Sequence, residues 1–234
     1  MTSPRAWVLL QSGRRLNLLN PSPFDWEDAD LAICLSRTNR WGGHSRWERP
    51  LSVAQHSLTV LALRQRRDGP LSATDALREL LHDADEGFLG FDPIAPLKPH
   101  LGDGYRTISD RLQRAIALRY RLRLWSAEDY AAHKHADRLA AASEAVHVAG
   151  WTRSEIRAAL KIKLAPLADD PLAPTNGFAP WEPWPPRIAA ALFLAKLEQL
   201  QARQASEFIP TAGPVERAAS PCCRQPELPL TAKR

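Results

Sequence analysis

Apolar residues recur at three- and four-residue steps along most of the chain, which is the spacing of one face of an α-helix. Seven stretches carry this pattern, at 26–36, 52–65, 73–87, 105–120, 127–149, 152–167 and 186–204. Residues 7–19 instead show short extended segments around Ser12-Gly13-Arg14-Arg15, as in a small hairpin. The pattern predicts an all-α, mainly helical fold with a small N-terminal β-hairpin.

Two further segments differ from these helices in composition. Residues 169–186 are rich in proline and tryptophan and too apolar for a free linker, so we expect them to pack across the helical body. From Ala205 onward, proline, alanine, serine and charged residues lack a helical period, which predicts a disordered tail over 205–234. A chain of 234 residues can bury one substantial core, so 1–204 is expected to form a single domain.

The charge of the chain favours an anionic partner. The formal net charge is +5, and four arginines lie near one acid, Glu48, just before His56: Arg37, Arg40, Arg46 and Arg49. This bias indicates a phosphate-bearing ligand, with a merely solvated basic face as the alternative. No helix-turn-helix, zinc-finger or RNA-binding signature accompanies the arginines, so no nucleic acid polymer is expected as a partner.

Cysteines and hydrophobic runs indicate the compartment. The three cysteines, Cys34, Cys222 and Cys223, cannot form the disulfide framework of a secreted protein. No apolar run approaches the length that spans a membrane. We therefore expect a soluble cytoplasmic protein without a membrane partner.

The strongest chemical signal is the doublet His82-Asp83, which lies between an upstream His56 and a downstream Asp137. Imidazole and carboxylate together suit a divalent cation. An isolated His56 on an inward stripe would more often be a core histidine, but the doublet reverses that preference. Asp137 falls in a closely packed helical stripe, where a carboxylate needs a partner that a metal would supply. These residues predict a metal-dependent hydrolase.

Glu86 is the candidate general acid or base. It follows Asp83 by three residues and His82 by four, so on one continuing helix it would project from the same face as both. Gly87 is then expected to end or loosen that helix. The segment from Phe88 to Lys98 contains two prolines and is predicted to be a shaped loop that can overhang the site.

Several phrases of the sequence resemble those of a known protein family. The resemblance is to the HD-domain phosphohydrolases, in their bacterial and phage 5′-deoxynucleotidase-like branch, and covers about residues 7–167. The phrases that carry it are Asn39-Arg40-Trp41-Gly42-Gly43-His44, Ser52-Val53-Ala54-Gln55-His56, His82-Asp83-Ala84-Asp85-Glu86, Asp92-Pro93-Ile94-Ala95-Pro96-Leu97-Lys98 and Ala136-Asp137-Arg138.

The resemblance implies a helical HD-domain bundle that hydrolyses a phosphate ester of a deoxynucleotide, releasing phosphate from a deoxynucleoside monophosphate. It implies Glu86 as the catalytic carboxylate and Arg40 and Trp41 as nucleotide contacts. The implied cofactor is a divalent metal ion, with Mn, Co, Fe, Zn, Ni and Mg all open. Its implied ligands are His56, His82, Asp83 and Asp137.

Some features depart from the family or leave alternatives open. Leu51 stands where relatives tend to have an aromatic residue, and the segment between Glu86 and the Pro-Leu-Lys turn is one residue longer. Asp92 and Lys98, on that segment, are candidate substrate contacts, and His44 is either a phosphate contact or a surface histidine. The remaining histidines are interpreted as structural or exposed: His100, His133, His135 and His147.

Three alternatives concern the protein as a whole. Release of triphosphate from a deoxynucleoside triphosphate needs the same metal core, so the motifs do not separate it from monophosphate hydrolysis. A non-catalytic nucleotide-binding protein on the same scaffold is the alternative from another class. A homo-oligomer is also open, because relatives often self-associate.

Overall fold

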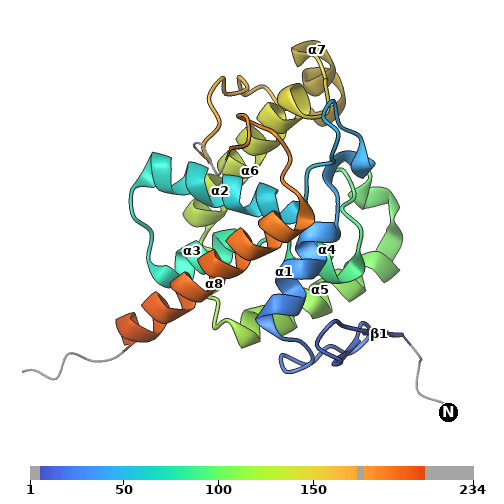
Figure 1. The fold of residues 1–234 in the computed structure, drawn as a ribbon, viewed down its shortest axis with the longest axis vertical. Helices are drawn as coiled ribbons and strands as arrows, with labels where there is room; N and C mark the ends of the chain where they lie inside the picture. Colours follow the sequence, from blue (N-terminus) through green and yellow to red (C-terminus); the bar gives the residue numbers. More distant parts are fainter. Residues whose placement is uncertain (1–5, 173–176, 209–234) are drawn as a thin grey trace, which may run out of the picture.

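The structure is a computed structural model that describes residues 6–172 and 177–208, and it is a body of helices with one small hairpin (Figure 1). The all-α prediction with an N-terminal hairpin is thus confirmed. In chain order the elements are β1 Trp7–Leu9, β2 Arg15–Asn17, α1 Asp28–Arg37, η1 Arg40–Gly43, α2 Val53–Asp68, α3 Ala73–Leu80, α4 Ala84–Leu89, η2 Lys98–His100, α5 Gly102–Arg119, α6 Ala127–His147, α7 Arg153–Glu155, the π-helix η3 Ile156–Leu160, and α8 Pro186–Phe208.

Helix α2 lies at the centre of the fold. It packs against α1, α3, α6 and α8, and α8 crosses α1 and α3 as the orange helix of Figure 1. Ser52 caps α2 by accepting a hydrogen bond from the Gln55 backbone N–H. Because every residue from Val53 to Leu61 is buried, a polar residue on this helix is held inside the protein. His56 is one such residue, with no exposed surface.

The hairpin forms where it was predicted. β1 and β2 pair antiparallel with Val8 opposite Leu16, and Leu16 is fully buried. The turn between them is tied to α1, because the Ser12 backbone N–H and hydroxyl both donate to the Asp30 carboxylate. The hairpin is therefore an integral edge of the helical body.

The predicted helix over 73–87 is in fact two helices. α3 ends at Leu80, and α4 begins at Ala84 after a turn that contains both His82 and Asp83. Gly87 does not end the helix as predicted but lies inside α4, which ends at Gly90 in the left-handed conformation. The physical reason for Gly87 is close packing: a Cβ there would lie 2.8 Å from the Leu35 side chain on α1.

Gly87→Ala should consequently destabilise the protein, although alanine is the better helix former. Overpacking against Leu35 should lower the free energy of unfolding by about 1–3 kcal/mol. The matched control is Gly104→Ala in α5, where a Cβ would meet nothing within 4 Å. This control should raise the free energy of unfolding by about 0.5–1 kcal/mol. Urea denaturation of both variants checks the opposite signs; equal signs would contradict the packing account.

The predicted helix over 152–167 is wrong for its second half. Only α7 and η3 are helical, and the chain leaves η3 at Lys161 in a left-handed conformation with φ of 57°. The departure lets Ile156 and Ile162 pack in one cluster with Trp41, so tertiary packing overrides the local period.

Segments near the C-terminus were largely predicted. Residues 169–186 do pack on the body where they are described: Trp181 and Trp184 are buried, and the Gln55 amide bonds the Glu182 carbonyl and the Trp184 N–H. α8 continues past Gln204 to Phe208, so the predicted tail does not begin at Ala205. The rest of that tail, with Cys222 and Cys223, lies outside the described residues.

Among the described helices, none combines the length and apolar character needed to cross a bilayer.

Candidate functional site

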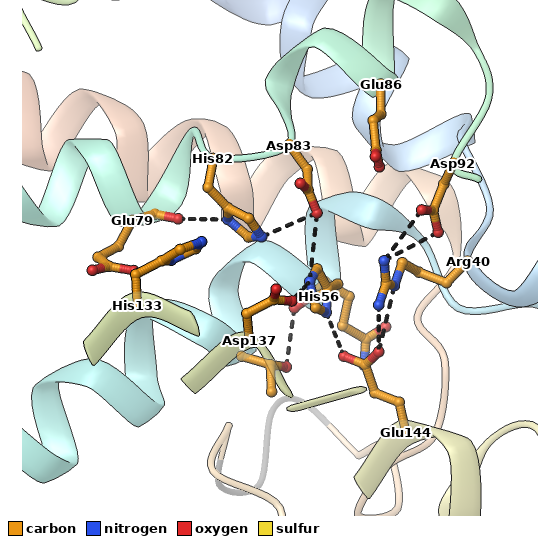
Figure 2. Close-up of polar contacts among 12 residues, drawn as sticks. Arg40, His56, Glu79, His82, Asp83, Glu86, Asp92, His133, Asp137 and Glu144 are labelled. Atoms are coloured by element: carbon orange, nitrogen blue, oxygen red, sulfur yellow. Dashed lines mark hydrogen bonds and ion pairs between the residues drawn. The ribbon is translucent and has the colours of Figure 1, made fainter. Parts of the chain in front are cut away.

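The four predicted metal ligands converge from three parts of the fold (Figure 2). α2 supplies His56, the turn between α3 and α4 supplies His82 and Asp83, and α6 supplies Asp137. One ligand atom each from His56, His82 and Asp137 lie within 4.8 Å of one another, so this group could hold a metal ion. Asp83 is outside that group, but its Oδ2 lies 3.0 Å from His82 Nε2 and 3.6 Å from His56 Nε2.

Both imidazoles are fixed with Nε2 free to act as a ligand. His56 Nδ1 donates to Glu144 Oε1 at 2.7 Å, and His82 Nδ1 donates to the Glu79 carbonyl at 2.8 Å. In the neutral ring the other nitrogen, Nε2, then carries a lone pair. Both Nε2 atoms are buried and have no hydrogen-bond partner among the described residues. Each Nε2 instead faces a carboxylate oxygen, with Asp83 Oδ2 3.0 Å from His82 Nε2 and Asp137 Oδ1 3.6 Å from His56 Nε2. A metal ion between these atoms would bind nitrogen and oxygen together.

The carboxylates around these rings favour a cation. Burial raises the pKa of Asp83, but the adjacent His82 outweighs it and holds that pKa well below its usual range. Burial also raises the pKa of Asp137, but its contact with His56 and the charge of Lys134 hold that pKa well below its usual range. Burial and the Arg40 charge lower the pKa of His56, but Glu144 and the contact with Asp137 raise it to about 9. Negative charge is thus concentrated around the two imidazoles. A proton on His56 and the ammonium group of Lys134 balance part of it.

Glu86 lies beside this group in the first turn of α4. Because the helix breaks at the doublet, Glu86 does not share one helix face with His82, contrary to the prediction. Its link is to Asp83, the residue just before α4, whose carbonyl accepts from the Glu86 N–H at 3.1 Å. Its carboxylate is buried, Lys98 Nζ donates to Oε1 at 2.8 Å, and Oε2 has no partner among the described residues. Burial, with the charges of Asp83 and Asp92, raises the pKa of Glu86 well above its ordinary value.

Arg40 and Trp41 are placed by the segment that leads into α2. Asn39 forms a β-bridge with Ser52, and the Arg40 N–H bonds the Leu51 carbonyl at 2.8 Å. This bridge brings the segment beside the start of the helix that carries His56.

The Arg40 guanidinium is held by two carboxylates. Nη1 lies 3.1 Å from Asp92 Oδ2, and Nε lies 3.5 Å from Glu144 Oε2. Glu144 therefore contacts both the presumed metal ligand His56 and Arg40 (Figure 2). Trp41 is in the left-handed conformation, with φ of 56°, and its ring packs on Trp151 with 5.7 Å between centroids.

A cavity of about 350 Å³ opens onto these residues. Asp83, Asp92 and Asp137 line it, so it reaches the presumed ligands. Its cationic lining residues are Arg40, Lys98, Lys134 and Arg138, and its apolar ones include Trp41, Ile94, Leu160 and Ile162. The cavity can accept a ligand that has an anionic group and a flat apolar part. His44, by contrast, is exposed and is not among the lining residues, so the structure does not bring it to the site.

Two buried carboxylates of the site were missed in the sequence. Glu144 is the partner of His56, and it lies seven residues after Asp137, which places both on one face of α6. That spacing was the available signal. Glu79 is fully buried and bonds Arg64 and His133, while its carbonyl holds His82. No local signal singles it out. His133, interpreted as structural or exposed, is buried, and its ring lies 4.8 Å from that of His82.

Comparison with known proteins adds a relative of unassigned function. The chain is 41% identical over 152 residues to an uncharacterized protein of Rhodobacter capsulatus. The aligned region covers 64% of this chain and 77% of that protein. The chain belongs to the same family as this protein. No family model matches the sequence. The functional interpretation therefore depends on the geometry of the site.

Proposed function

We propose that this protein is a metal-dependent phosphohydrolase that acts on deoxynucleotides, most directly on deoxynucleoside 5′-monophosphates. One observation carries the proposal. The Nε2 atoms of His56 and His82 meet the Asp83 and Asp137 carboxylates beside a cavity whose wall is rich in arginine and lysine. The resemblance of the sequence motifs to HD-domain phosphohydrolases supports the same reading.

The donor set fits a divalent cation that accepts nitrogen and oxygen ligands, which leaves Mn, Co, Fe, Zn, Ni and Mg open. His56, His82, Asp83 and Asp137 would hold it. When bound, such an ion polarises a phosphoryl oxygen and lowers the pKa of coordinated water. Glu79 and Glu144 support the ligands from behind, because each fixes the orientation of one imidazole ring.

The chain itself supplies charge and proton transfer. Arg40 and Lys98 face the cavity and can contact phosphoryl oxygens through charge-assisted hydrogen bonds. Glu86, with its raised pKa, can hold a proton on Oε2 and deliver it to the leaving oxygen of the ester. A protein that only bound nucleotides would need no such buried carboxyl group, which supports an enzyme.

The apolar part of the cavity supports a nucleotide. The indole of Trp41 and the side chains of Ile94, Leu160 and Ile162 form walls against which a sugar and base can pack. A volume of about 350 Å³ lies near the small end of ligand cavities, which suits one compact nucleotide.

The test is a substrate panel on protein that has been stripped with a chelator and reloaded with one metal at a time. Deoxynucleoside monophosphates, ribonucleoside monophosphates and deoxynucleoside triphosphates are compared, with p-nitrophenyl phosphate as a substrate that has no sugar. We expect metal-dependent release of orthophosphate, fastest from the deoxynucleoside monophosphates. Release of triphosphate would favour the triphosphohydrolase alternative, and no release with any metal would refute the proposal.

Trp41→Phe should change the choice of sugar. Trp41 lines the cavity, where its indole can pack against the sugar of a bound nucleotide. A smaller ring in this place should alter the deoxy-to-ribo ratio of kcat/KM by about three- to tenfold, or roughly 0.6–1.4 kcal/mol. Trp151→Phe is the control, because it loses the same ring contact but does not line the cavity. A ratio that changes equally in both variants would assign Trp41 to packing alone.

Glu144→Gln should weaken metal binding without removing a ligand. A glutamine cannot supply the negative charge that now faces both His56 Nδ1 and Arg40. Outer partners of this kind typically change metal affinity by about 10–100-fold. Isothermal titration calorimetry with the metal ion measures this affinity. An unchanged affinity would show that Glu144 serves only Arg40.

A further inference from the structure

A second cavity lies beside the first, between α6 and the segment after η3. It has a volume of about 440 Å³, and Lys134, Arg138 and Ile162 line both cavities. The additional basic residues of the second cavity are His135, Lys161 and Lys163. No acidic residue is among those that line it. We call this second cavity the basic groove.

The cations of the basic groove are largely unpaired. Lys134 donates to Asp137, at 2.9 Å. Within the described ranges, no hydrogen bond or ion pair joins Arg138, Lys161 or Lys163 to a carboxylate. Like charges that are gathered without counter-charges repel one another and raise the local concentration of anions. The groove is therefore electrostatically prepared for a polyanion.

The backbone brings two distant parts of the sequence together here. α6 supplies Lys134 and Arg138, and the segment after η3 supplies Lys161 and Lys163. The turn depends on Lys161, which has φ of 57°. This conformation is uncommon for a residue with a side chain, and it costs about 1 kcal/mol or more. A glycine would relieve the strain, yet the chain has a lysine whose side chain lines the groove.

We propose that the basic groove binds a second phosphate group of the same nucleotide whose first phosphate lies at the presumed metal ligands. This inference rests on the proposed function. The groove shares three lining residues with the substrate cavity, so a ligand in that cavity lies next to the groove. The second phosphate is attached either at the 3′ position of the sugar or to the first phosphate, and these two sources share the same chemistry at the groove.

Equilibrium binding tests the inference on metal-loaded protein with Glu86→Gln, so that ligands stay intact. The three ligands are dAMP, deoxyadenosine 3′,5′-bisphosphate and dATP. We expect at least one of the two ligands with a further phosphate to bind about tenfold tighter than dAMP, as one added charge-assisted contact would give. The ligand that shows the gain identifies where the second phosphate is attached.

Variants of the basic groove should remove that gain and leave dAMP affinity unchanged. One is Lys161→Glu with Lys163→Glu; the other is Lys161→Gly with Lys163→Ala, where glycine suits the backbone of position 161. The control for the glutamate pair is Arg66→Glu with Arg67→Glu, which changes the net charge by the same amount at a site about 15 Å from His56 along α2. This control should keep the gain.

Two results would overturn the inference: no gain for either ligand in the parent protein, or an equal loss for dAMP and the doubly phosphorylated ligands in both groove variants. Failure of the proposed function looks different. Hydrolysis of the substrate panel would then be absent, while the groove-dependent gain in binding would persist. Conversely, hydrolysis of dAMP without any gain would retain the function and reject the groove.

Discussion

Glu86→Gln is expected to lower kcat by about 10²–10⁴-fold, the usual contribution of a positioned acid or base. Glutamine has nearly the same shape, and its amide oxygen can still accept from Lys98. It cannot carry the proton that the raised pKa of Glu86 allows on Oε2. Metal content, measured by elemental analysis, should stay at the parent level, because the Glu86 carboxylate pairs with Lys98 and contacts neither imidazole among the described residues.

Asp85→Asn is the matched control for Glu86→Gln. Asp85 is the preceding buried carboxyl group on α4, but it accepts from Ser109 and Gln113 on α5. Replacing this carboxyl group by an amide should leave kcat within a few-fold of the parent value. If both variants lose turnover equally, Glu86 acts through the packing of α4. If Glu86→Gln loses its metal, the carboxylate belongs to the ligand shell.

Asp83→Asn is expected to cost most of the metal affinity. Its Oδ2 faces the Nε2 atoms of both His56 and His82, and the low pKa keeps it negatively charged. A neutral amide in that place is a far weaker ligand for a divalent cation. The loss should exceed the roughly 10–100-fold change typical of outer partners, and the rise in melting temperature on adding metal should disappear with it.

Asp92→Asn is the control for Asp83→Asn. Asp92 lines the same cavity but pairs with Arg40 and contacts neither imidazole. It should retain metal binding. A metal-induced rise in melting temperature that survives in Asp83→Asn would restrict the ligand shell to His56, His82 and Asp137.

Local signals were sufficient where they agreed with tertiary packing. Ser52 and Ser126 cap α2 and α6 close to the positions that the periodicity predicts, and the hairpin follows its extended residues. The order His56, His82-Asp83, Asp137 correctly predicted that these side chains meet. Short motifs could do this because each lies on, or next to, a helix that the pattern had already located.

Tertiary contacts decided what the sequence pattern did not reveal. The helix breaks at the doublet, where His82 turns to donate to the Glu79 carbonyl, although its local composition favours one continuous helix. The exit at Lys161 depends on packing between Trp41, Ile156 and Ile162, which are distant in sequence. The same exit places Lys161 and Lys163 beside α6, so the basic groove has no local signature at all.

The central claim is that metal-loaded protein hydrolyses a phosphate ester at this site. The most direct measurement is phosphorus NMR of dAMP incubated with metal-loaded protein in ¹⁸O-labelled water. The account predicts orthophosphate that carries one solvent oxygen, formed by the parent protein, and far slower formation by Glu86→Gln or after chelation. Unchanged dAMP with every metal, or phosphate formed equally fast by Glu86→Gln, would contradict it.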